Sequence, residues 1–210
     1  MVRIILSNNY TDNSWETIVE VYRFGESSWR NIDSFSAFLL AIEDDGMYIG
    51  GTLNWLALRN MQGAVYDSGA VTLDMLVIFS LELKSETYKQ ILLPNGIDEL
   101  PSHKPSLNVW GNCLYLSHDY KRTHFIVWQM KEFGDENSWT QLLKISFQHI
   151  NVELLLPLFI RENGDIFVLR VSNGDISKIV LYDQRINSVD HIILDQSHFP
   201  VTNDYVESLV

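Results

Sequence analysis

The sequence has little cysteine and no long apolar run, and each shortage excludes a class of protein. Cys113 is the single cysteine among 210 residues, so an internal disulfide is impossible. One free thiol suits a reducing compartment, and we expect a cytoplasmic or nuclear protein. No stretch approaches the ~20 apolar residues that a membrane-spanning helix needs. The opening apolar run, Ile4–Leu6, is too short for a signal peptide.

Basic residues are scarce as well. Fifteen Lys and Arg against 27 Asp and Glu give a formal net charge of −12, and the longest basic run is Lys121-Arg122. A nucleic-acid-binding protein needs clustered cations to displace counterions from phosphates. The same shortage argues against binding to an anionic membrane surface. We therefore expect neither nucleic acid nor a membrane as a partner.

Patterns that carry catalysis are absent or incomplete. Gly46–Thr52 has the glycine spacing of a phosphate loop, but it lacks the lysine and is not followed by a helix. The acidic runs Glu43–Asp45 and Asp135-Glu136 lie in turn-like stretches, whereas catalytic carboxylates need burial that separates their pKa values. The sequence contains neither a GxSxG nor an HExxH motif. We expect no catalytic residue and no enzymatic activity.

A metal site is also not expected. Cys113, His118 and His124 have spacings that zinc could use, but no fourth ligand stands nearby. Cys113 lies in an apolar stretch, where a thiol usually behaves as a small hydrophobic side chain. We expect no bound metal and no cofactor.

What the chain has in abundance is short apolar runs separated by turn residues, which predict β-strands. Asn-Gly pairs flanked by such runs are strong hairpin signals; they stand at Asn95-Gly96, Asn163-Gly164 and Asn173-Gly174. Contiguous apolar runs predict strands buried on both faces, namely Leu76–Phe79, Phe125–Trp128 and Ile179–Tyr182. Two polar stretches, Ser7–Ser14 and His118–Thr123, are expected to be loops. Phe35–Ile42 is compatible with a short helix or a buried strand, and its β-rich surroundings favour a strand.

The strand pattern repeats. In the stretch Phe125–Ile145 an apolar strand and a polar turn lead to an aromatic residue, and weaker copies recur along the chain. The anchors are Trp29, Tyr88, Trp139 and Val189, spaced 59, 51 and 50 residues apart. A second signature, glycine before alternating apolar residues, interleaves with the first at Gly51, Gly111 and Gly164. Each period of about 50 residues therefore holds four short strands, as in a kelch-type propeller blade.

This period predicts an all-β, kelch/β-propeller-like repeat domain with about four blade-like units. A four-stranded blade exposes two apolar faces, which stacking buries with large aromatic residues between neighbours. Four units lie near the lower limit of a closed propeller. The chain also begins directly in a strand. We expect residues 1–210 to be one domain, incomplete, from the C-terminal part of a longer parent.

Three blocks resemble the F-box-associated domain (type 1) of plant F-box/kelch-repeat proteins. They are Gly51–Leu56, Phe79–Pro94 and Trp128–Trp139, the last containing Trp-Gln-Met-Lys-Glu-Phe-Gly; the ending Tyr205–Val210 also matches. The resemblance covers almost the whole chain. It departs from the family in one respect, because residues 1–210 contain no F-box.

The resemblance implies the target-binding part of a substrate receptor of SCF-type (Skp1–cullin–F-box) E3 ubiquitin ligases. The implied partner is a protein target of ubiquitination; a Skp1-like adaptor would bind only through an F-box, which is missing from this chain. Strands are consumed by packing, so recognition is expected in loops. The candidate substrate-binding residues are Tyr66, Asp67, His118, Asp119, Tyr120, Lys121 and Arg122. An acidic receptor favours a target with a basic patch.

Two alternatives stay open. A propeller-fold carbohydrate-binding or glycosidase-like protein would expose its tryptophans as a stacking platform, whereas a stack of blades buries them between sheets. A truncated, non-functional fragment would have no activity of its own.

Overall fold

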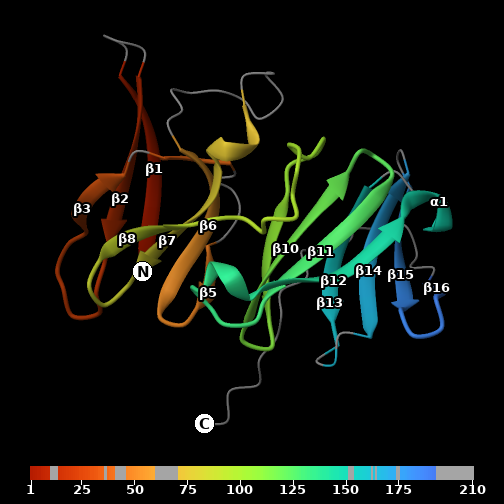
Figure 1. Ribbon diagram of the computed structural model, residues 1–210. Helices are drawn as coiled ribbons and strands as arrows, with labels where there is room; N and C mark the ends of the chain where they lie inside the picture. The colour runs from red at the N-terminus through yellow and green to blue at the C-terminus, as the bar shows by residue number, and fades with distance from the viewer. Residues whose placement is uncertain are drawn as a thin grey trace.

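The computed structural model describes residues 1–9, 14–35, 37–40, 46–59, 71–150, 154–161, 163, 165–173 and 176–192. These residues form four antiparallel sheets, which stand beside one another in chain order (Figure 1). We call them blades 1 to 4. The described part of the chain has no helix of the length and hydropathy that crossing a bilayer requires.

Blade 1 has the strand order β1 (Val2–Asn9), β2 (Ser14–Val21), β3 (Arg30–Phe35). Blade 2 contains β4 (Ala37–Leu39), β5 (Met47–Ile49), β6 (Thr52–Arg59), β7 (Leu76–Glu82) and β8 (Thr87–Ile91). Blade 3 has the order β9 (Ser106–Trp110), β10 (Cys113–Tyr120), β11 (His124–Met130), β12 (Trp139–Ser146). Blade 4 has β13 (Leu154–Ile160), β14 (Ile166–Asn173), β15 (Ile176–Asp183), β16 (Ser188–Ile192). The short helices are η1 (Leu73–Met75), η2 (Glu136–Ser138) and α1 (Phe147–Ile150).

The predicted repeat is confirmed. Tyr88, Trp139 and Val189 lie at or near the start of the last strand of blades 2, 3 and 4, and Trp29 directly precedes the last strand of blade 1. Gly51 and Gly111 lie in the turns that lead into β6 and β10. In blade 2 the first strand is in two pieces, since β4 and β5 pair with different parts of the same strand, β6. Blades 2 to 4 are thus built on one four-strand plan.

The hydrophobic core lies between blades, in three clusters. One joins blades 1 and 2, the second blades 2 and 3, and the third blades 3 and 4. Each contains one buried indole side chain, since Trp55, Trp139 and Trp110 are only 7–9% exposed; the partly buried Trp128 also packs against the cluster between blades 2 and 3. Along β6 the buried side chains alternate between the first two clusters, with Trp55 and Ala57 in one and Leu56 and Leu58 in the other. The middle strands of blades 2 and 3 are therefore buried on both faces, as the runs Leu76–Phe79 and Phe125–Trp128 predict. The prediction is wrong for Ile179–Tyr182, where Val180 and Tyr182 are buried and Ile179 and Leu181 are half-buried, because the described blades pack against only one face of blade 4.

Two stretches predicted as loops contribute residues to strands. β1 continues to Asn9 and β2 begins at Ser14, so every residue of the stretch Ser7–Ser14 that the structure describes lies in a strand. β10 likewise continues to Tyr120. The reason is that the ladder is made by backbone groups, which pair across polar and apolar residues alike. In the ambiguous stretch Phe35–Ile42, Phe35 lies in β3, Ala37–Leu39 form β4 and Leu40 is a bend, so strand is confirmed for the residues up to Leu39 that the structure describes.

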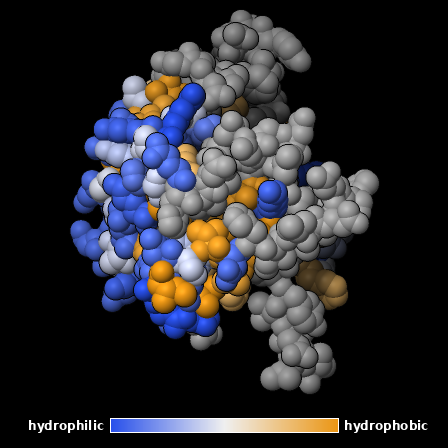
Figure 2. All heavy atoms as spheres, turned by 90° about the vertical axis from the view of Figure 1, so that its right-hand side faces the viewer, coloured by the Kyte–Doolittle hydropathy of each residue, from blue (hydrophilic) through white to orange (hydrophobic). Residues whose placement is uncertain are grey.

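The described surface on the blade 4 side is mainly polar. Figure 2 looks onto the blade 4 side, where hydrophilic side chains cover most of the coloured area around a smaller hydrophobic group. Large exposed hydrophobic side chains in the described ranges are spread over blades 1, 2 and 4; they are Met1, Ile5, Phe24, Tyr48, Leu92, Phe159 and Ile186. Scattered residues of this kind are normal on a protein surface.

Candidate functional site at the β10–β11 hairpin

Five of the seven predicted binding residues lie together at one end of blade 3. His118, Asp119 and Tyr120 end β10, and Lys121 and Arg122 form the turn into β11. The expectation that all five are exposed loop residues is wrong for His118 and Asp119, which are 4% and 5% exposed. Their backbone continues the ladder with β11 and carries both side chains into the interior. The other two predicted residues, Tyr66 and Asp67, lie outside the described residues.

His118 is held in one orientation by two hydrogen bonds. The indole N–H of Trp128 donates to Nε2 of His118 at 3.1 Å, so the ring proton is on Nδ1. Nδ1–H then donates to the backbone carbonyl of Asp119 at 2.9 Å. Burial lowers the pKa of His118, although the Asp119 backbone contact acts in the opposite direction. His118 is therefore a neutral residue that positions Trp128.

Asp119 ties a neighbouring loop to the strand. Its carboxylate accepts from the backbone N–H of His103 at 2.8 Å and of Ser102 at 3.3 Å. Nδ1 of His103 lies 3.4 Å from the same carboxylate. Because a buried carboxylate requires such partners, Asp119 fixes the loop that precedes β9 beside the hairpin. The loop displays the half-exposed ring of His103 there.

The tip of the hairpin is cationic around one aromatic ring. Nζ of Lys121 lies 4.9 Å and Nζ of Lys144 lies 5.0 Å from the ring centroid of Tyr120. The Tyr120 hydroxyl, followed by the carboxylate of Glu99 at 3.8 Å, raises the pKa of Lys121. Lys121 and Arg122 have φ of +52° and +53°, a conformation that side chains other than glycine rarely adopt. Such strained positions concentrate at functional sites.

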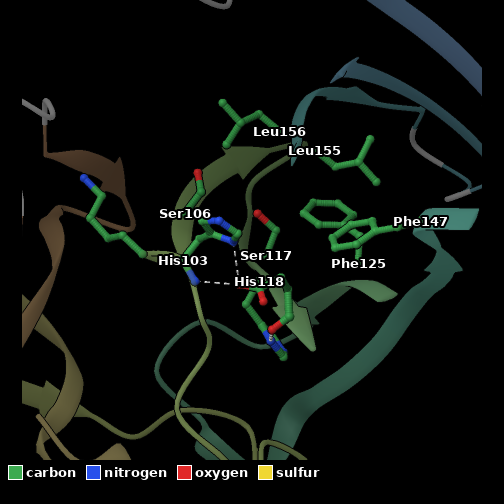
Figure 3. A pocket seen from close by; sticks show the side chains of 10 residues that line it. His103, Ser106, Ser117, His118, Phe125, Phe147, Leu155 and Leu156 are labelled. Carbon is green, nitrogen blue, oxygen red and sulfur yellow. Dashed lines mark hydrogen bonds and ion pairs between the residues drawn. The ribbon is translucent and has the colours of Figure 1, made fainter. Parts of the chain in front are cut away.

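Beneath the hairpin a small pocket separates blades 3 and 4. Figure 3 shows His103, Ser106, Ser117 and His118 grouped together, with the apolar side chains beside them; the latter are Phe125, Phe147, Leu155 and Leu156. The cavity measures about 20 Å³, which is room for roughly one water molecule. Ser117 Oγ is buried here and has no hydrogen-bond partner in the described part of the chain. The site can hold water but no small-molecule substrate, so its usable part is the outer surface.

Several residues of this surface could not be found from the sequence. His103 was detectable only in part, because Pro101 and Pro105 on either side predict a loop without indicating where it lies. Lys144 reaches Tyr120 from β12. Asp98 and Glu99 come from the segment after β8. Only the stacking of strands brings these residues to the hairpin.

Metal chemistry has no support in the described residues, where no group of three His, Cys, Asp or Glu side chains could hold an ion. Cys113 begins β10 and packs against the core between blades 3 and 4. The buried indoles of Trp55, Trp110 and Trp139 are not available as a stacking platform for sugars.

Comparison with known sequences matches the chain to one domain family and to F-box proteins. The family model described as "F-box associated beta propeller domain" matches residues 1–210. The chain is 25% identical over 186 residues to the F-box/kelch-repeat protein At3g23880 of Arabidopsis thaliana, covering 88% of this chain and 43% of the relative. It is also 25% identical over 138 residues to F-box protein CPR1 of the same plant, covering 60% and 31%. The chain thus spans less than half the length of these relatives.

Comparison with solved structures gives matches of low sequence identity. The β-propeller domain of the Trilobed protease from Pyrococcus furiosus matches with a TM-score of 0.46 at 13% identity, covering 92% of this chain and 53% of that one. TolB from Acinetobacter baumannii matches with a TM-score of 0.45 at 13% identity, covering 90% and 40%.

Proposed function

Because the chain belongs to the F-box associated β-propeller domain family, we propose that it captures a protein target for an SCF-type ubiquitin ligase. Docking on the Skp1 adaptor would require an F-box, which the names of the relatives include and residues 1–210 do not contain. The chain itself would be a recognition module without catalytic activity. It would work in the cytosol or nucleus, where the free thiol of Cys113 stays reduced.

One observation carries the proposal. In blades 2 and 3 both faces of the middle strands are used in packing blade against blade, so the accessible surface of these blades consists mainly of turns and outer strands. Surfaces of this kind carry recognition because their side chains contribute little to the core. The β10–β11 hairpin is the best-defined candidate, since two buried residues, His118 and Asp119, hold it in place.

We propose that Tyr120, Lys121 and Arg122 touch the target directly, with His103 beside them. His118 and Asp119 would act through them as positioning residues. The net charge of −12 favours approach of a basic target. The hairpin tip, by contrast, carries the positive charges of Lys121 and Arg122, which would pair with a carboxylate on the target.

The test is a comparison of ubiquitinated proteins in plant cells that express the chain joined to an F-box. With the proteasome inhibited, we expect specific proteins to accumulate as ubiquitin conjugates with the wild-type fusion, and at least five-fold less with the K121E/R122E fusion. The K84E/K178E fusion is the matched control, since it reverses two exposed lysines on blades 2 and 4. Equal conjugates for all three fusions would contradict a role for the hairpin, and no conjugates above those of the F-box alone would contradict target capture.

A further inference from the structure

Blade 2 turns a partly polar face toward blade 3. The cluster between these blades is apolar where Leu56, Ile78 and Ile91 lie side by side. Two residues further along each strand the same face becomes polar. The pairing register sets two rows there, the first of Asn54, Ser80 and Lys89 and the second of Thr52, Glu82 and Thr87.

A cavity of about 280 Å³ opens over this polar face. It is lined by Ser80, Glu82 and Lys89 of blade 2, and by Phe133, which reaches across from the turn after β11. Its volume is slightly below the range of drug-sized ligand sites and matches one long side chain better. The opening lies at the start of β6 and β8, whereas the hairpin site lies at the end of β10.

The floor of the cavity contains a buried hydroxyl oxygen, Ser80 Oγ, without a hydrogen-bond partner in the described part of the chain. Ser80 is 0% exposed, and its Oγ has no partner within the described ranges. Asn54 on β6 pairs with Ser80 but does not line the cavity; it is also 0% exposed, its amide nitrogen donates to Thr52 Oγ and the Met47 carbonyl, each at 2.9 Å, and its Oδ1 has no partner in the described ranges. Buried polar atoms without partners are costly, so a site that leaves them open is suited to a ligand that supplies them.

The open groups are mainly acceptors. In the lining, Glu82 presents a carboxylate, which accepts, and Ser80 Oγ can donate or accept. Lys89 is the one cationic residue in the lining, and its Nζ lies over the ring of Phe133, 5.3 Å from the ring centroid. No carboxylate in the described part of the chain forms an ion pair with it. A complementary ligand therefore brings several N–H donors and a positive charge, with a flat surface to lie against Phe133.

We propose that this cavity binds an arginine side chain of the protein target. The guanidinium group offers five donors in a plane and stacks on aromatic rings, which an ammonium group does not match. The net charge of −12 favours approach of such a group. The proposal deepens the proposed function, since the arginine is taken to belong to the captured protein.

The test is an NMR titration of the ¹⁵N-labelled chain with N-acetyl-L-arginine methylamide, and separately with the corresponding lysine and glutamate compounds. We expect saturable shifts of the Asn54 side-chain amide and the Phe133 backbone amide with the arginine compound. The lysine compound should bind at least three-fold more weakly and the glutamate compound should leave both signals unchanged. Equal shifts from arginine and lysine, or binding of glutamate, would overturn the proposal.

Variants locate the binding. E82Q keeps an acceptor for the Lys84 backbone N–H, which donates to Glu82 Oε1 at 3.2 Å, but removes the charge; we expect about ten-fold weaker binding of the arginine compound. S80A should weaken binding about three-fold while keeping the fold, because it removes a buried group without a partner. E132Q is the control for net charge, with an exposed side chain on the adjacent turn. Equal weakening by E132Q and E82Q would exclude the cavity.

The two proposals fail in different ways. If the chain does not bind the arginine compound but the F-box fusion still ubiquitinates its targets, the arginine site is excluded and the proposed recognition function stands. If the chain binds the arginine compound but the fusion captures no target, the arginine site stands and the proposed recognition function is excluded.

Discussion

The indole N–H of Trp139 in blade 3 donates a 3.1 Å hydrogen bond to the backbone carbonyl of Leu92, which directly follows the last strand of blade 2. The N–H of the same Leu92 donates to Oε1 of Glu136 at 2.7 Å. Both polar groups of one peptide segment are thus satisfied by the neighbouring blade. The same turn places Phe133 over Gly50. The block Trp128–Trp139, which carries the family resemblance most clearly, therefore fastens two blades together.

Replacing Trp139 with Phe should reduce the free energy of unfolding by about 2 kcal/mol. The change removes the bond to Leu92 and leaves a gap in a core residue that is only 9% exposed. Urea denaturation of wild type and W139F measures the difference. W29F is the control, since Trp29 packs against Tyr22 and Arg3 through its ring alone in the described structure. A loss for W29F as large as for W139F would show that indole volume, and not the bond, is responsible.

Gly96→Ala should be more destabilising than an ordinary turn substitution. A Cβ at Gly96 would overlap the ring of Trp128, which is held by His118 and cannot move freely. We expect a loss of about 2–3 kcal/mol, measured by urea denaturation. G111A should cost only about 1 kcal/mol, because its Cβ would meet open space and only the φ of +53° opposes it. Similar losses for both would contradict the overlap.

His118 should make the protein less stable in mild acid. Its pKa is lowered by burial, so the unfolded chain binds more protons than the folded one below about pH 6.5. The free energy of unfolding is therefore unaffected by His118 above that pH and falls as the pH decreases toward the lowered pKa. Protonation would also turn Nε2 into a donor facing the Trp128 N–H. Stability measured from pH 8 to 5 should fall more steeply for wild type than for H118Q; parallel curves would contradict the prediction.

Glu86 should contribute in the opposite direction. Arg30, and with it Arg23, holds the pKa of Glu86 below its ordinary value, joining the β7–β8 turn to blade 1. This contribution is complete above about pH 4.3 and is lost as the pH falls through the lowered pKa. E86Q should be slightly less stable than wild type at pH 7, and the difference should shrink as the pH falls through the lowered pKa of Glu86. Since both arginines are partly exposed, 1 M salt should also shrink it.

Relieving the backbone strain at the hairpin tip should increase stability and weaken target binding. Asn-Gly is the preferred pair where both turn residues have positive φ, so K121N/R122G should raise the melting temperature by about 2–4 °C. The same variant removes the two exposed cations and should reduce target ubiquitination by the F-box fusion. Calorimetry and the conjugate comparison together test this. A stabilised variant with full target capture would show that the strain at Lys121 and Arg122 has no role in recognition.

By itself the sequence determined the class of structure. Apolar runs separated by turn residues specify strands because side-chain polarity along a strand reflects burial of its faces. The spacing of Trp29, Tyr88, Trp139 and Val189 specifies the repeat, since each period must build one unit that buries its neighbour. The placement of tryptophans between blades follows from the same reasoning. These are properties of residues near one another in the chain.

Only the tertiary structure decided where the hairpin ends and what surrounds it. Polar residues such as His118 and Asp119 continue a strand because backbone pairing does not depend on their side chains. A prediction based on their polarity therefore starts the loop too early in the chain. The approach of Lys144 to Tyr120, and of Phe133 to the row of Asn54 and Ser80, joins segments far apart in sequence. Strand register and blade stacking create such neighbours, and these depend on pairings between distant segments that local residue order does not encode.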